Sequence, residues 1–242
     1  MASAIVTKET LKRIISDISD IIKNPLHDNG IYYEHDESHM LKGYVMIIPT
    51  DDTPYQYGYY FFSVEFPTNY PYAPPIVTYL TNNGKTRFHP NLYRNGKVCL
   101  SILNTWKGEQ WTSCNTLSSI LLNIVMLFTN KPFLHEPGIY ETHHAFQAYT
   151  DTIIYQNYKT AICKVVMDEE YLDKLVHMKK YFGDTIITQY KKNKEAISQK
   201  LGTLVEQHKE GFHLEVPLYK MYEYIDYPKL YLKLKEYNSK LV

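Results

Sequence analysis

The sequence has 242 residues, of which 44% are hydrophobic and 21% are charged, so it can bury the core of one large domain or of a domain with a substantial extension. Lys plus Arg and Asp plus Glu both number 26, and the formal net charge of +0 favours neither a nucleic acid nor a membrane as the partner. The N-terminus shows no secretory pattern, and no apolar run is long enough to span a bilayer. These features predict an intracellular protein, cytoplasmic and/or nuclear.

The cysteines of the chain are Cys99, Cys114 and Cys163. Their odd number and the absence of a C-x-x-C pair argue against a disulfide framework and against a zinc site. We therefore expect three free thiols in a reducing compartment and no bound metal.

The first predicted element is an amphipathic helix within residues 10–25, where apolar residues recur at intervals of three and four. Lys12 and Arg13 fall on or near its solvent side. The proline cluster "FPTNYPYAPP" further along the chain cannot continue a ladder of strands. Runs rich in aromatic and β-branched residues lie on either side of this cluster, at residues 30–37, 40–49, 59–66 and 76–80. These runs predict a four-stranded antiparallel meander.

Two further helices are predicted. The first covers residues 115–130 and begins at Asn115 or Thr116, and the second covers residues 143–166. With the preceding elements they form a predicted domain over residues 1–167.

A helical extension is predicted over residues 168–242, where the composition changes to Lys and Glu mixed with spaced apolar residues. A long helix in this part is expected to be weakened at Gly202. Pro217 and Pro228 are expected to break the rest into short helical pieces.

The last part of the extension carries an apolar stripe at helical spacing, which a lone helix must bury against something. Its residues are Leu230, Leu234, Tyr237 and Leu241. We expect this stripe to pack on the domain itself, against the helix that contains Ile153, Ile154 and Ile162.

The stretch "HPNLYRNGKVCLSIL" places Cys99 eight residues after Asn91 and before an apolar run. A cysteine in such a run is most often a small buried core residue, but a thiol can also serve as a nucleophile. Asparagine beside proline commonly forms a turn, and its amide N–H can also stabilise a developing oxyanion. The local sequence leaves these alternatives open.

The order of these elements, with the proline cluster, "HPNLYRNGKVCLSIL", Trp106 and Trp111, resembles the catalytic domain of ubiquitin-conjugating enzymes over roughly residues 7–167. The segments "DTPYQYGYYFF", "TWKGEQW", "HEPG" and "TAICKVV" are similar to the larger, C-terminally extended Z-type members. The resemblance implies an α+β ubiquitin-conjugating fold with a C-terminal helical extension. It also implies a transferase that carries ubiquitin or a ubiquitin-like protein.

By this resemblance, Cys99 accepts the modifier from an activating enzyme as a thioester and passes it to a substrate lysine or to a ubiquitin ligase. Asn91 would stabilise the oxyanion, and Tyr93 would line the groove for the acceptor lysine, the alternative being scaffold packing. Glu136 or His135 would desolvate and orient that lysine, the alternative being a solvated loop charge, and the sequence does not choose between the two residues. No bound metal or organic cofactor is implied, because ATP is used upstream by the activating enzyme.

Three residues match family positions that contact partner enzymes. Tyr72 matches a ligase-facing position, and Lys12 and Arg13 match positions that meet the activating enzyme and ligases, the alternative being a solvated helix face. The second ligase-facing loop departs from the family, because "WTSC" places Ser113 and Cys114 where a Pro-Ala pair is usual. This departure weakens the prediction of ligase docking through that loop. We expect Cys114 to be a buried free thiol, the alternative being an exposed and reactive one.

Two other functions fit parts of the pattern. An inactive adaptor would keep the fold, but such variants typically lose the cysteine. A Cys-His hydrolase would use His89 or His135 as its base, although the local sequence is unlike that of papain-like or caspase-like nucleophiles. His89 is expected instead to hold its loop by hydrogen bonding. The extension is expected to select partners and not to affect chemistry, so truncation after residue 167 should preserve lysine discharge.

Overall fold

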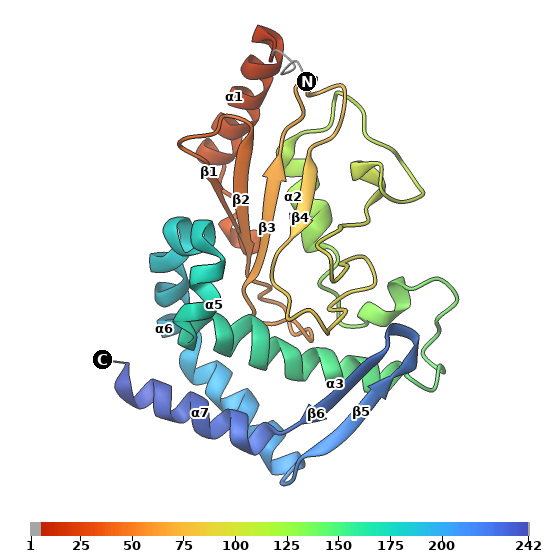
Figure 1. The fold of residues 1–242 in the computed structure, drawn as a ribbon, viewed down its shortest axis with the longest axis vertical. Helices are drawn as coiled ribbons and strands as arrows, with labels where there is room; N and C mark the ends of the chain where they lie inside the picture. Colours follow the sequence, from red (N-terminus) through yellow and green to blue (C-terminus); the bar gives the residue numbers. More distant parts are fainter. Residues whose placement is uncertain (1–5, 242) are drawn as a thin grey trace.

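A four-stranded antiparallel sheet lies at the centre of the structure, a computed structural model that describes residues 6–241 (Figure 1). The strands lie in the order β1-β2-β3-β4, so each one pairs with its neighbour in sequence. The predicted meander is confirmed. The strands are β1 (Ile31–His35), β2 (Lys42–Ile47), β3 (Tyr60–Glu65) and β4 (Ile76–Tyr79).

The central strands β2 and β3 are buried on both faces over most of their length, which explains their nearly continuous apolar runs. Successive side chains of a strand point to opposite faces. Val45 and Phe62, which pair across the two strands, belong to one hydrophobic core. Met46 and Phe61, their neighbours in sequence, pair with each other and belong to a second core. A slip of one residue would exchange the two faces, so packing on both sides fixes the register.

Helices from the N-terminal two thirds of the chain cover the first face. They are α1 (Lys8–Lys23), α2 (Leu117–Val125) and α3 (Phe146–Gln156). The side chain of Thr7 caps α1 by accepting a hydrogen bond from the backbone N–H of Thr10, and Thr116 caps α2 in a reciprocal box with Ser119. Helix α2 therefore begins where the sequence predicted. It ends before residue 130, because the chain turns there with short-range backbone hydrogen bonds.

Helix α3 continues into a π-helical segment, Asn157–Lys164, and then into α4, Val165–Met167. The buried amide of Asn157 is bonded at both ends: Oδ1 accepts from the hydroxyl of Tyr60 at 2.7 Å, and Nδ2 donates to the carbonyl of Gln56 at 2.9 Å. These bonds attach the segment to the sheet and to the loop before β3.

The C-terminal part of the chain packs on part of the second face of the sheet with α5 (Glu169–Lys174) and α6 (Val176–Gln207) (Figure 1). Phe182 of α6 stacks on Phe61 with ring centroids 6.4 Å apart, and His177 stacks on Tyr44 at 4.7 Å. Burial of one such large side chain contributes about 1.5–3 kcal/mol. The extension is therefore a structural layer of the fold, and α6 continues without interruption past Gly202.

A β-hairpin lies in the extension where the sequence predicted short helical pieces, so that prediction is wrong. The hairpin joins β5 (Phe212–Val216) to β6 (Met221–Ile225). Pro217 opens the turn between them, and Lys220 closes it in the left-handed region at φ 50°. Pro228 does not break a helix, because it lies in the first turn of α7 (Tyr227–Lys240), where proline is tolerated.

The apolar stripe of α7 is buried as expected, but its main neighbour is α6. Leu230 and Leu234 share the second core with Ile162, whereas Ile153 belongs to the first core. The partner helix that the sequence predicted is thus only partly right. Because the extension also reaches the first core through the hairpin, both cores contain residues from both sides of residue 168.

Short 3-10 helices complete the described chain: η1 (His27–Asn29), η2 (Ser101–Leu103), η3 (Pro132–His135) and η5 (Pro217–Tyr219). No helix between residues 6 and 241 combines the length and the apolar composition that a membrane crossing requires.

Candidate active site

The segment around Cys99 is folded back on the residues before it. The backbone N–H of Cys99 donates to the carbonyl of Asn91 at 2.9 Å, and Nδ2 of Asn91 donates to the carbonyl of Cys99 at 2.7 Å. An antiparallel bridge between Leu92 and Val98 lies just inside this pair. The turn between them requires Gly96 at φ 91°, where a Cβ would lie 2.7 Å from Thr78. This geometry fixes the asparagine amide beside the cysteine backbone.

The imidazole of His89 holds the same loop by a hydrogen bond to its backbone. Its Nδ1 accepts a hydrogen bond from the backbone N–H of Asn91 at 3.0 Å, and the side chain is completely buried. Burial lowers the pKa of His89 well below its ordinary value, and the nearby His135 and Arg87 lower it further. The ring is therefore neutral and acts as an acceptor within the loop. With Nδ1 engaged and the ring buried, His89 is poorly placed to serve as the base of a hydrolase.

The three thiols have different surroundings. Cys99 is only 2% exposed, so a reagent in solution reaches its side chain only if neighbouring groups move. Cys163 is buried in the second core, and burial raises the pKa of its thiol to about 12. Cys114 is exposed, so the expectation of a buried thiol is wrong. Within residues 6–241, no group of three or more His, Cys, Asp or Glu side chains is arranged to hold a metal ion.

The structure separates the two candidates for orienting the acceptor lysine. The hydroxyl of Tyr219, from the hairpin of the extension, donates a hydrogen bond to Oε2 of Glu136. His135 instead packs edge-on against His89 with ring centroids 4.7 Å apart, and desolvation lowers its pKa. The two side chains therefore differ in partner although they are adjacent in sequence.

Tyr93 is half-buried and stacks on Arg87, whose guanidinium carbon lies 3.2 Å from the ring centroid. Arg87 also donates through Nε to the carbonyl of His89 at 3.1 Å and through a terminal nitrogen to the carbonyl of Pro90. The guanidinium thus joins Tyr93 to the loop that precedes Cys99. Arg87 could not be identified from the sequence, because a single arginine before a proline motif has no local signal.

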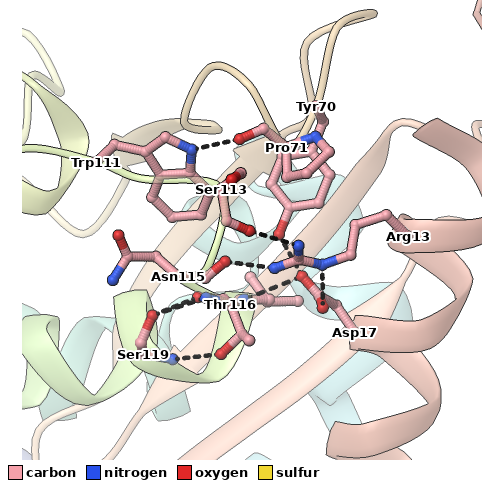
Figure 2. Close-up of polar contacts among 10 residues, drawn as sticks. Arg13, Asp17, Tyr70, Pro71, Trp111, Ser113, Asn115, Thr116 and Ser119 are labelled. Carbon is pink, nitrogen blue, oxygen red and sulfur yellow. Dashed lines mark hydrogen bonds and ion pairs between the residues drawn. The ribbon is translucent and has the colours of Figure 1, made fainter. Parts of the chain in front are cut away.

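Arg13 is turned toward the protein, as Figure 2 shows. Its Nε lies 2.9 Å from Oδ1 of Asp17, and its two terminal nitrogens donate to the carbonyls of Ser113, at 2.7 Å, and Asn115. Asp17 is 5% exposed and also accepts from the hydroxyl of Tyr70. We call Arg13, Asp17, Tyr70, Ser113 and Asn115 the Arg13 clamp. It attaches the "WTSC" loop to α1.

The remaining residues predicted to contact partners are accessible. Lys12 is exposed on α1, and Tyr72 is 81% exposed in the proline loop. The indole N–H of Trp111 donates to the carbonyl of Pro71 at 2.7 Å, which joins this loop to the "WTSC" loop. The three segments therefore form one continuous surface, although the guanidinium of Arg13 is occupied within it. Contact of Lys12 and Tyr72 with partners stays a prediction.

Residues 13–164 match the family model described as ubiquitin-conjugating enzyme, and this match covers the Arg13 clamp, the sheet and the Asn91–Cys99 loop. The chain belongs to the ubiquitin-conjugating enzyme family. The family and the α+β conjugating fold predicted from the sequence are thereby confirmed.

Several curated members of this family are similar to the chain. Ubiquitin-conjugating enzyme E2 Z of Xenopus tropicalis is 37% identical over 163 residues, which cover 66% of this chain and 51% of the relative. Its namesake from Homo sapiens is 38% identical over 161 residues, 65% of this chain and 45% of the relative. Probable ubiquitin-conjugating enzyme E2 26 of Arabidopsis thaliana is 32% identical over 181 residues, which cover 70% of this chain and 33% of the relative. The chain spans about half the length of each of the first two relatives.

Proposed function

We propose that this conjugating enzyme accepts ubiquitin or a ubiquitin-like protein from an activating enzyme as a thioester on Cys99 and transfers it to a substrate lysine or to a ligase. The observation that supports this best is the paired hydrogen bonding of Asn91 and Cys99, which places an amide donor beside the thiol-bearing residue. Its activating enzyme, ligase and substrate would meet it in the cytoplasm and/or the nucleus.

Loading is an exchange between two sulfur atoms. The Cys99 thiolate attacks the carbonyl carbon of the modifier's thioester, a new C–S bond forms, and the old C–S bond breaks as the activating enzyme's thiolate leaves. No electrons are gained or lost, and the thioester is conserved. This step needs no bound metal or organic cofactor, and ATP would be used upstream.

Discharge is attack by an amine on the Cys99 thioester. A C–N bond forms, the Cys99 sulfur leaves with the electron pair of the C–S bond, and the amine loses a proton to Glu136 or to solvent. One N–H of the Asn91 amide holds the Cys99 carbonyl, which leaves its second N–H to stabilise the oxyanion of the tetrahedral intermediate. Of the two candidates, Glu136 and His135, we infer that Glu136 orients the amine, because the ring of His135 packs on His89.

A non-reducing gel of the full chain, incubated with a panel of activating enzymes, modifiers and ATP, tests this proposal. We expect a thiol-sensitive adduct that becomes a slower-forming, thiol-resistant ester in Cys99→Ser and is absent in Cys99→Ala. Cys114→Ser is the matched control and should load normally, because this thiol is exposed and lies outside the Asn91 loop. Loading that survives in Cys99→Ala and is lost in Cys114→Ser would place the nucleophile elsewhere. An inactive adaptor would load in none of these reactions.

The role of Asn91 is tested by single-turnover discharge to free lysine. Loss of an oxyanion donor slows such steps by about a hundredfold or more, so Asn91→Ala should slow discharge far more than loading. It also removes the hydrogen bond to the Cys99 carbonyl, which should lower the free energy of unfolding by about 1 kcal/mol. Asn95→Ala, an exposed change in the same loop, is the control. Unchanged discharge in a folded Asn91→Ala protein would leave Asn91 with a turn-forming role only.

A further inference from the structure

The tip of the extension's hairpin lies against the conjugating domain at the edge of the candidate active site. Val216 and Met221, which flank the tip, are buried in the first core with residues of α2 and α3. The backbone carbonyl of Tyr219 accepts a hydrogen bond from the side chain of Arg94, which lies three residues after Asn91. A segment more than a hundred residues from Cys99 in sequence is thus fixed against the loop that leads to Cys99.

The side chain of Tyr219 fills the space between two loops of this site. Its ring lies 5.9 Å from that of Phe133 and 5.6 Å from that of Tyr149, measured between centroids. The guanidinium carbon of Arg87 is 5.4 Å from the same ring and 3.2 Å from Tyr93. The ring therefore packs on Phe133, in the loop that carries Glu136, and on Arg87, which is hydrogen-bonded to the loop before Cys99.

The hydroxyl of Tyr219 makes one hydrogen bond, to Oε2 of Glu136. Burial raises the pKa of Tyr219 far above its ordinary value, and the bond to the carboxylate raises it further, so the phenol stays protonated and remains a donor. Among the described residues, the other carboxylate oxygen of Glu136 accepts no side-chain hydrogen bond. A bond that fixes one oxygen also fixes the direction of the second, which is free to accept from an amine.

We propose that Tyr219 is a positioning residue that holds the Glu136 carboxylate toward the attacking amine, so that the C-terminal extension completes the acceptor side of the active site. The inference rests on the proposed function, in which Glu136 orients the acceptor lysine. It replaces the expectation that the extension affects partner choice and not chemistry.

The test uses the full chain and Tyr219→Phe, which keeps the ring contacts and removes only the hydroxyl. The protein is loaded with the modifier that the gel panel identifies, and single-turnover discharge to free lysine is then measured. Small misplacements of an orienting group commonly cost large factors in rate, so we expect discharge to slow by about tenfold. Loading should stay within about twofold of the wild-type rate, because that step has no amine to orient. Tyr222→Phe, an exposed change in the same hairpin, is the matched control and should discharge normally.

A double-mutant cycle separates positioning from general structural support. If Tyr219 acts through Glu136, Tyr219→Phe should slow discharge in the wild-type background and have no further effect in a Glu136→Gln background. Additive effects of the two changes would overturn the inference, as would equal slowing of loading and discharge. Wild-type discharge by Tyr219→Phe with normal loading would refute the role of Tyr219 and leave the proposed function intact. A chain that forms no thioester would refute the proposed function itself, and the inference with it.

Discussion

Replacement of Arg13 by alanine tests whether this residue acts mainly as the clamp seen in Figure 2 or mainly as a contact for other enzymes. The guanidinium joins α1 to the "WTSC" loop through the carbonyls of Ser113 and Asn115, and it pairs with the buried Asp17. Removing it leaves the loop without these bonds and leaves Asp17 without its cation. The change should therefore destabilise the fold even when no partner is present.

The size of the effect follows from these contacts. A hydrogen bond that involves a charged group contributes about 1.5–3 kcal/mol, and unpairing a buried charge costs about 3–5 kcal/mol. Both free-energy contributions are smaller at this site. The Arg13 side chain is 23% exposed, so water replaces part of its bonding, and Asp17 keeps its hydrogen bonds from Tyr70 and from the backbone of Leu117. We expect Arg13→Ala to lower the free energy of unfolding by about 2–3 kcal/mol.

Equilibrium unfolding in urea, with linear extrapolation to water, measures this loss. Lys12→Ala is the matched control, because Lys12 is the exposed neighbour on the same helix and should change stability by less than about 0.5 kcal/mol. In Arg13→Lys the charge is kept, but the lysine cannot bind both carbonyls and Asp17 together. Its loss of unfolding free energy should therefore lie between those of Arg13→Ala and Lys12→Ala. Equal stabilities for Arg13→Ala and Lys12→Ala would show that the clamp contributes nothing to the fold.

Three further outcomes are expected. In the native protein, a thiol-alkylating reagent should modify Cys114 first, while Cys163, which is buried with a thiol pKa of about 12, should react only after unfolding; mass spectrometry of the labelled peptides gives the order. Leu234→Ala should lower the free energy of unfolding by about 3 kcal/mol in urea, because this side chain is 0% exposed, and a loss below about 1 kcal/mol would contradict its burial in the second core. Truncation after residue 167 should yield aggregated protein in size-exclusion chromatography, since it uncovers the second face of the sheet, and a soluble, cooperatively folding product would contradict this.

Local sequence patterns predicted the four strands of the sheet and the start of α2 well. The four strand-like runs contain the observed strands, and the start of α2 at its Thr116 cap was readable because caps and strands have short-range signals. The burial of the α7 stripe was also visible in its spacing. These features depend on residues only a few positions apart.

The hairpin was missed because its local signal is weak. Each strand has five residues, most of its side chains are at least partly exposed, and the proline between the strands resembles a helix breaker. The π-helical segment Asn157–Lys164 was missed for a related reason: it depends on the contacts of Asn157 with Tyr60 and Gln56, which lie about a hundred positions away.

Long-range side-chain contacts account for the rest. The sequence placed Arg13 near the wet side of its helix, but the carbonyls that it binds are a hundred positions further along the chain. Glu136 and His135 could not be distinguished from the sequence, because their partners, Tyr219 and His89, are brought together only by the fold. Long-range packing of the extension on the second face of the sheet also explains why truncation, first expected to preserve discharge, is now expected to give aggregated protein.

Intact-mass spectrometry of the loaded full chain is the most direct test of whether Cys99 carries the modifier. We expect an adduct whose mass is the sum of the two proteins less one water, which an added thiol removes by exchange and which peptide mapping assigns to Cys99. An adduct that resists the thiol in the wild-type protein, or that maps to Cys114 or to a lysine, would contradict this role of Cys99.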